Sequence, residues 1–197
     1  ITIDDDSAAT TTAQTIELDA LAVTNTKTTT ITSTLDNLLL DTSISVGAAN
    51  NLVMNLAGTL TNGTGETITA SSLDASGSSG AATLFLSGGV GTVSTGSGDD
   101  SLTIEGVATG GTTVNMNAGD DTLNAIDESI TVDGGAGTDT VAYAVTADLS
   151  GQTFALTNVE VLDIDSAGAS DNTITVDSSQ VTGDSYLIKS TVGNGGT

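Results

Sequence analysis

Apolar and polar residues alternate along most of the chain, in short runs separated by Gly, Asn, Asp and Ser. Such runs lie at Ile1–Asp5, Thr15–Val23 and Thr29–Asp41, and similar ones follow to the end of the sequence. A period of two is typical of β-strands with one buried face, and the separating residues are common in turns. Helical periodicity is nearly absent. The pattern therefore predicts an all-β protein.

The strand-like runs recur at a nearly constant step. Spacings of 17, 21 and 17 residues separate four leucines of the pattern, Leu18, Leu35, Leu56 and Leu73. Spacings of 21 and 18 residues separate three aspartates that follow glycine-containing turns, Asp100, Asp121 and Asp139. A step of this size fits one coil of a narrow parallel solenoid, in which stacked coils bury Leu, Ile and Val. We expect a parallel β-solenoid, of the β-roll or β-helix type.

We expect residues 1–197 to form a single continuous β domain, because no Pro-rich or charged linker interrupts them. Residues 1–92 form an irregular Thr/Leu-rich β region, 93–144 hold glycine–aspartate repeats, and 145–197 return to strands without the repeat. A β-sandwich is the alternative for the first ninety residues, where the turns share no motif. The abrupt ends of the sequence lead us to expect a piece of a longer, or a trimmed, protein.

The charge balance is extreme, with 25 acidic residues against two lysines, no arginine and no histidine, for a net charge of −23. Nucleic acids and anionic membranes need a basic surface, so we expect neither as a partner. No apolar run is long enough to span a membrane, so we expect no direct membrane insertion. The acidity instead favours cations as partners. Cysteine is absent, which excludes disulfides and thiolate metal sites.

Catalytic options are few, because without His, Cys or Arg only carboxylates, hydroxyls and two lysines remain. Metalloprotease, serine-hydrolase and P-loop motifs are absent. A polysaccharide lyase or hydrolase with paired carboxylates is formally possible. Such enzymes usually hold sugars with aromatic and basic residues, and aromatics are only 2% of this chain. We expect no enzymatic activity.

Three turns match the calcium-binding nonapeptide G-G-x-G-x-D-x-U-x, where U is apolar. Gly134–Ala142 matches every fixed position, Thr95–Thr103 lacks only the first glycine, and Met116–Asn124 lacks two. Asn117 stands in one of those glycine places and tolerates a left-handed backbone. The alternative is that Gly and Asp are simply good turn formers. Three matches in register, each followed by an apolar residue, favour the metal-binding interpretation.

The residue types suit calcium. Glycine lets a turn adopt positive φ and direct its carbonyl oxygens inward, and aspartate adds a hard anionic oxygen. One turn cannot supply the six to eight oxygens that calcium takes, whereas two stacked turns can. We therefore predict one column of calcium on one side, with sites between the Asp100 and Asp121 turns and between the Asp121 and Asp139 turns. The predicted ligand residues are Gly96, Gly98, Asp100, Asn117, Gly119, Asp121, Gly134, Gly135, Gly137 and Asp139.

Other acidic residues have open roles. Asp99 and Asp120 occupy a free position of the repeat and are either solvated or additional ligands. Asp4–Asp6 form either a solvated run or a calcium site at a subunit contact. Further calcium could bind at Asp163, Asp165, Asp171 and Asp177. Asn62-Gly63-Thr64 is a lone N-glycosylation pattern.

At the repeats the sequence resembles the RTX family of exported bacterial proteins. Residues 71–104, "SSLDASGSSGAATLFLSGGVGTVSTGSGDDSLTI", look like segments of RTX-type surface-layer proteins and large adhesins, and "LTNVEVLDIDSAGASDNTITVDSSQVTG" is similar to their strand phrases. The resemblance implies type I secretion from a Gram-negative bacterium, a calcium-folded β-roll, and lattice assembly or adhesion. The chain departs from RTX toxins in having only three repeats, on one side.

Two functions are compatible with these features. We expect a structural subunit of an extracellular bacterial assembly, a surface layer or filament, whose fold and self-assembly into a homo-oligomer or polymer depend on calcium. The alternative is a calcium-rigidified adhesin stalk or carbohydrate-binding module, with cell-surface polysaccharide as its partner. In both cases we expect the protein to lie outside the cell or on its surface, and to bind calcium with a Kd of roughly 10⁻⁴ to 10⁻³ M.

Overall fold

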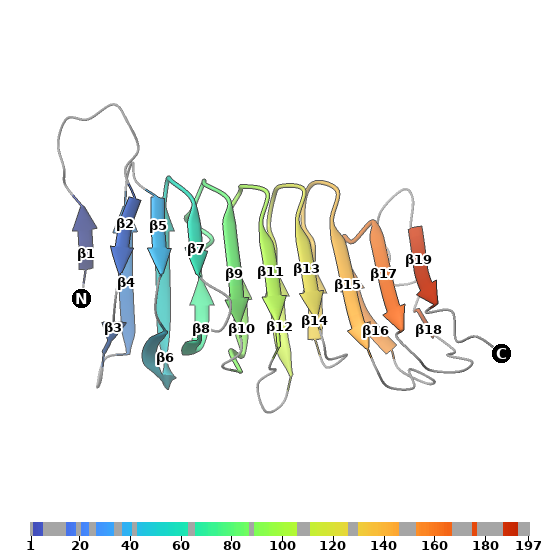
Figure 1. Cartoon of the computed structure of the whole chain (residues 1–197), viewed down its shortest axis with the longest axis horizontal. Helices are drawn as coiled ribbons and strands as arrows, with labels where there is room; N and C mark the ends of the chain where they lie inside the picture. Colours follow the sequence, from blue (N-terminus) through green and yellow to red (C-terminus); the bar gives the residue numbers. More distant parts are fainter. Residues whose placement is uncertain are drawn as a thin grey trace.

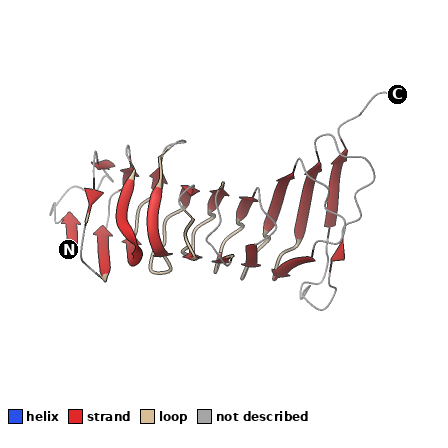
Figure 2. Ribbon diagram, turned by 90° about the horizontal axis from the view of Figure 1, so that it is seen from below, coloured by secondary structure: helices blue, strands red, loops and turns tan. Residues whose placement is uncertain are grey.

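The described strands lie side by side along one long axis, from β1 (Thr2–Asp5) at one end to β19 (Leu187–Val192) at the other (Figure 1). The structure is a computed structural model, and it describes residues 2–5, 15–18, 21–23, 27–33, 37–40, 43–62, 66–86, 89–105, 111–125, 130–145, 153–166, 175–176 and 187–192. Seen from below, the strands follow one another as successive coils (Figure 2). No helix in these ranges is long and apolar enough to cross a membrane.

The described strands form two sheets, of 10 and nine strands. Sheet A contains β1, β3 (Leu21–Ala22), β4 (Thr28–Ser33), β6 (Ile44–Leu56), β8 (Ile68–Asp74), β10 (Thr92–Ser94), β12 (Thr112–Asn115), β14 (Ile130–Asp133), β16 (Thr153–Thr157) and β18 (Thr175–Val176). Sheet B contains β2 (Thr15–Leu18), β5 (Asn37–Leu40), β7 (Leu60–Asn62), β9 (Ala82–Leu86), β11 (Ser101–Ile104), β13 (Thr122–Ala125), β15 (Thr140–Val145), β17 (Val161–Ser166) and β19.

The chain alternates between the two sheets. From β4 onward, each strand of sheet A is followed in the sequence by a strand of sheet B, and the strand after that belongs to sheet A again. The pairings between neighbouring coils are parallel, for example β10 with β12 and β11 with β13. The prediction of an all-β parallel solenoid is confirmed. The division into zones at residues 92 and 144 stays a prediction.

The core lies between the sheets, because alternate residues of each strand point inward. One row of paired, buried side chains crosses sheet B: Leu84, Leu102, Leu123, Val141 and Leu162. A second row crosses sheet A: Leu52, Leu73, Val93, Val114, Val132 and Leu156. The polar residues of the alternating pattern lie on the outer faces, so each coil buries its apolar face against the opposite sheet and its neighbours.

The leucine spacing predicted from the sequence is wrong in register. Leu73 pairs with Leu52 rather than Leu56, and Leu18 pairs with Leu40. Leu35 lies outside the described residues. The leucines occur at several positions within a coil, so equal spacing did not mark equivalent positions.

Two of the strand-like runs predicted from the sequence each contain two strands. Thr15–Val23 contains β2 and β3, and Thr29–Asp41 contains most of β4 and all of β5, with the two parts of each run in different sheets. The chain changes from one sheet to the other within each run, and period-two alternation does not mark this change. A β-sandwich requires antiparallel strands. The described strands of the first ninety residues pair in parallel, as β4 does with β6, so this alternative is wrong.

Asn62, the residue of the predicted glycosylation pattern, has a structural role. The Asn62 side chain is buried, its Nδ2 donates to the Phe85 carbonyl at 2.8 Å, and its Oδ1 accepts from the Phe85 amide at 2.6 Å. Asn62 therefore binds the backbone of the next coil and is not accessible for glycosylation in the folded chain.

Candidate metal centre

The three glycine–aspartate turns stack along one edge of the solenoid. They connect β10 to β11, β12 to β13, and β14 to β15 (Figure 1). Ser101 pairs with Thr122, and Thr122 with Thr140, so the residues before them are brought into one column: Asp100, Asp121 and Asp139. Because equivalent turns succeed one another without an intervening coil, the three aspartates predicted from the sequence occupy neighbouring coils.

The buried aspartates form a ladder in which each one accepts a hydrogen bond from the preceding coil. The Ala82 amide donates to Asp100 Oδ1 at 2.6 Å. The Asp100 amide donates to Asp121 Oδ1 at 2.7 Å, and the Asp121 amide to Asp139 Oδ1 at 3.0 Å. One oxygen of each carboxylate thus satisfies a backbone donor between coils.

Glu160 continues this ladder, and the sequence analysis missed it. Its Oε2 accepts from the Asp139 amide at 2.8 Å. Glu160 follows Asp139 by 21 residues and precedes the buried Leu162 by two, the same spacing that relates Asp100, Asp121 and their apolar partners. That signal was readable, but the turn before Glu160 lacks glycine.

The second oxygen of two aspartates has no partner. Asp121 and Asp139 are 1% and 0% exposed, and their buried Oδ2 atoms have no hydrogen bond to any residue that the structure describes. In the first turn, Asp100 Oδ2 accepts from the Gly96 amide at 3.1 Å. Burying a carboxylate oxygen without a partner is costly. The column therefore contains two adjacent orphaned oxygens that a cation would satisfy.

Burial also raises the pKa values of the aspartates in the column. It raises the pKa of Asp121 to about 7 and that of Asp139 to about 6, and it raises the pKa of Asp100. Neighbouring acids add to the effect, with Asp100 acting on Asp121 and Glu160 on Asp139. The chain has only two cationic side chains, so it cannot balance these carboxylates internally. A bound cation would restore their usual ionisation.

The turn glycines bring the backbones of adjacent coils together. Gly119 and Gly137 have φ of +128° and +141°, and a Cβ on either would collide with a carbonyl oxygen of the preceding coil, from Gly98 and Gly119 respectively. Side chains at four further glycines would also overlap the backbone of a neighbouring coil: Gly96, Gly98, Gly134 and Gly135. Asn117 takes the left-handed backbone expected of it, with φ of 64°. Carbonyl oxygens therefore lie close to the space between the turns.

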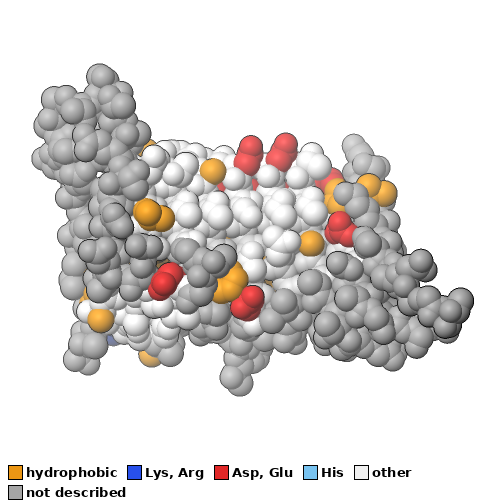
Figure 3. Space-filling model, viewed as in Figure 1, with side chains coloured by type: hydrophobic (Ala, Val, Ile, Leu, Met, Phe, Trp, Pro, Cys, Tyr) orange, Lys and Arg blue, Asp and Glu red, His pale blue; other side chains and the backbone are white. Residues whose placement is uncertain are grey.

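Asp99 and Asp120 form a second, outer ladder. Both are exposed, and acidic side chains are visible along this edge in Figure 3. Asp99 Oδ1 accepts from the Asp120 amide at 2.9 Å, and Asp120 Oδ1 accepts from the Thr138 amide at 2.8 Å. These bonds point to the following coil, opposite to the inner ladder. The two residues are thus exposed, and they also connect coils.

The donors of the column fit calcium, which takes carboxylate and carbonyl oxygens. Among the described residues, no group of three or more His, Cys, Asp or Glu side chains could hold a metal. Calcium between the turns would therefore need backbone carbonyls beside the carboxylates of Asp100, Asp121 and Asp139. The orphaned oxygens and the glycine-lined approach of the coils are compatible with this set.

Of the remaining acidic candidates, the structure describes the side chain of Asp163 alone. Asp163 lies on β17, half-buried, opposite Ala142 and Lys189 in register. The others lie outside the residues whose side chains are described: Asp4, Asp5, Asp6, Asp165, Asp171 and Asp177. Their proposed calcium sites stay predictions.

Comparison with known proteins identifies no protein similar to this chain. The sequence matches no protein-family model, and neither a curated protein nor a solved structure is significantly similar to it.

Proposed function

We propose that the stacked turns bind calcium, and that the chain is a calcium-stabilised structural segment of an extracellular bacterial assembly such as a surface layer or filament. The carboxylates of Asp100, Asp121 and Asp139 would hold the ions together with turn carbonyls at Gly96, Gly98, Asn117, Gly119, Gly134, Gly135 and Gly137. When bound, calcium supplies positive charge and coordination for the oxygens that point between the coils.

One observation carries the calcium proposal. Asp121 Oδ2 and Asp139 Oδ2 are buried in adjacent coils without a hydrogen bond, inside a chain of net charge −23. A turn that used aspartate only for its backbone geometry would not need a second buried oxygen. Placing two such oxygens in one column concentrates negative charge that must be offset by protons or by a bound cation.

The continuous sheets and the charge of the chain support the structural role. A solenoid whose coils pair through two continuous sheets is a stiff rod. Its acidic surface keeps copies apart until cations reduce the repulsion. Extracellular calcium would then favour both folding of the turns and association of the rods. The resemblance of the repeats to RTX proteins supports the same location, because low cytosolic calcium would leave calcium-dependent turns unfolded before secretion.

A calcium titration tests this proposal. The purified chain is titrated with calcium while far-UV circular dichroism and light scattering are recorded together, and EGTA is then added. We expect β signal and particle size to rise together and to reverse with EGTA. An unchanged spectrum and unchanged size would contradict calcium binding. A gain of β signal at constant monomer size would replace the assembly role with that of a rigid adhesin stalk.

A further inference from the structure

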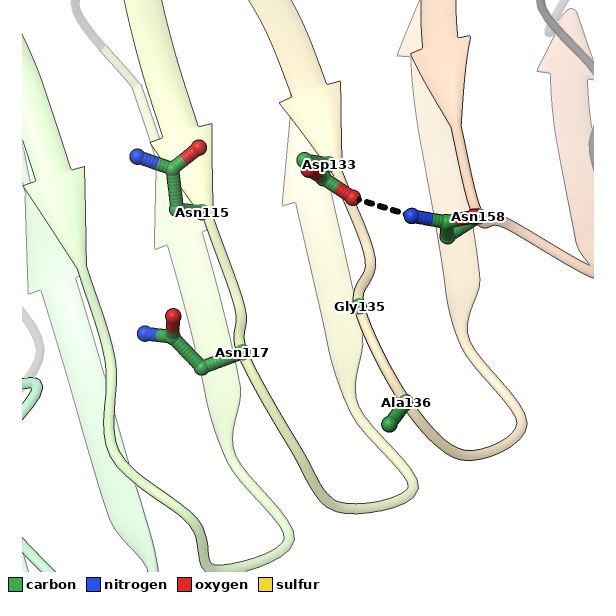
Figure 4. Close-up of a pocket in the computed structure, with 6 residues that line it drawn as sticks. All are labelled: Asn115, Asn117, Asp133, Gly135, Ala136 and Asn158. Atoms are coloured by element: carbon green, nitrogen blue, oxygen red, sulfur yellow. Dashed lines mark hydrogen bonds between the residues drawn. The ribbon is translucent and has the colours of Figure 1, made fainter.

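A polar cleft opens beside the column of turns, at the end of sheet A. We call it the amide cleft, and it has a volume of about 300 Å³. Its lining residues are Asn115, Asn117, Asp133, Gly135, Ala136 and Asn158 (Figure 4). Asn115 and Asp133 pair in register on β12 and β14, and Asn158 follows β16, so three neighbouring coils build the cleft.

The cleft combines fixed and free polar groups. Asn158 Nδ2 donates to Asp133 Oδ1 at 2.8 Å, and Asn117 Nδ2 donates to the Thr95 carbonyl at 2.6 Å. These bonds orient Asp133 and Asn117 and leave one oxygen of each side chain outside them. The Asn115 carboxamide makes no hydrogen bond with any residue that the structure describes. A ligand would therefore meet a free amide donor and at least three oxygen acceptors.

This lining selects among ligand classes. An apolar ligand would leave the amides and the carboxylate unpaired, which is costly. An anion would be repelled by Asp133 and by the acidic column beside it. A cation could use the oxygens but not the free amide of Asn115, and Asp133 is the only acidic side chain in the cleft. A sugar hydroxyl both donates and accepts, so adjacent hydroxyls can pair with the Asp133 carboxylate and the Asn115 amide together.

We propose that the amide cleft binds a neutral saccharide, with Asn115 and Asp133 as its principal hydrogen-bonding residues. The volume lies at the lower end of ordinary ligand pockets and suits one sugar unit. The row to which Asn115 and Asp133 belong continues in register to Ser94 on one side and Thr157 on the other, so a row of short polar residues crosses the strands beyond the cleft. A polysaccharide can follow this row. The absence of an aromatic platform in the lining predicts millimolar affinity for a single sugar.

The test uses the full chain, saturated with calcium and labelled with ¹⁵N. Mannose, glucose, galactose and N-acetylglucosamine are titrated separately into the tens of millimolar, and the side-chain amide resonances of asparagine are followed. We expect at least one sugar to shift the Asn115 and Asn117 side-chain signals saturably. Asn115→Ala should weaken that binding about fivefold, the loss of one hydrogen bond.

Asn124→Ala is the matched control, because Asn124 is an exposed asparagine on β13 of the opposite sheet. It should leave sugar binding unchanged. No saturable shift with any sugar, or equal weakening by both variants, would overturn the proposal. Circular dichroism of the same samples reports the calcium response separately, so failure of the saccharide site is distinguishable from failure of the calcium proposal.

Discussion

At the residue scale, the two carboxylate oxygens of Asp121 and of Asp139 have different tasks. Asp121 Oδ1 accepts the Asp100 amide, which requires only a hydrogen-bond acceptor. Asp121 Oδ2 is buried and unpaired, which favours a cation. An asparagine at this place keeps an acceptor for the first task and removes the charge needed for the second. Replacing Asp121 by asparagine therefore separates the hydrogen bond between coils from metal binding.

We predict that Asp121→Asn stabilises the chain without calcium and reduces the stability that calcium adds. In EGTA the variant should be more stable than the parent by about 1–2 kcal/mol, because a buried charge is removed. With calcium it should gain less stability than the parent, because one ligand has lost its charge. Thermal unfolding by circular dichroism, with and without calcium, measures both. Glu105→Gln is the control, because it removes an exposed charge outside the turns; it should change neither the stability in EGTA nor the gain with calcium. If Asp121→Asn were less stable than the parent in EGTA, this account would be contradicted.

The raised pKa values give a second prediction. The folded chain holds protons on Asp121 and Asp139 up to about pH 7 and pH 6, whereas the ordinary pKa is 3.8. The folded state therefore binds more protons than the unfolded state across this window, and stability falls as pH rises through it. In EGTA, Tm should be higher near pH 5 than above pH 7.

The stabilisation of the chain by calcium should increase with pH, because protons compete with the metal for the same oxygens. Calcium should therefore stabilise the chain more above pH 7 than near pH 5. The double variant Asp121→Asn with Asp139→Asn should flatten both pH profiles. A parent Tm that rises with pH in EGTA would show that these carboxylates are ionised without penalty.

At the element scale, the turns are the part of each coil that the sequence defines best. The motif places Asp100, Asp121 and Asp139 at equivalent corners, and the structure stacks them in one column. Corners without glycine carry a weaker signal, which is why Glu160 was missed although it accepts the same hydrogen bond. Leucine spacing failed because an inward position can be filled at any strand of the coil. The amide cleft was not predictable, since it depends on three coils meeting in register.

Gly119→Ala tests the close approach of the coils. The substitution combines a φ of +128° with a collision against the Gly98 carbonyl, so we expect a loss of about 1–3 kcal/mol and weaker calcium binding. Denaturant unfolding and calorimetric calcium titration measure the two effects. Ala136→Ser, an exposed change in the adjacent turn, should affect stability little. A Gly119→Ala chain as stable as the parent would mean that the turns are not tightly stacked.

At the scale of the whole molecule, apolar packing and electrostatic repulsion act against each other. Two ladders of buried aliphatic side chains hold the coils together along the axis. The net charge of −23 opposes that packing, and stacked aspartates add buried carboxylates to it at the turns. Cation binding between the turns would relieve part of this repulsion. Under the proposed function, the stability of the solenoid would depend on the calcium concentration around it.

The most direct test of this account is a crystal structure of the chain grown in calcium, with anomalous scattering used to locate the ions. We predict anomalous density between the Asp100 and Asp121 turns and between the Asp121 and Asp139 turns, within coordination distance of Asp121 Oδ2 and Asp139 Oδ2. A fully ordered column without density at either place, or density only beside the exposed Asp99 and Asp120, would contradict calcium binding between the stacked turns.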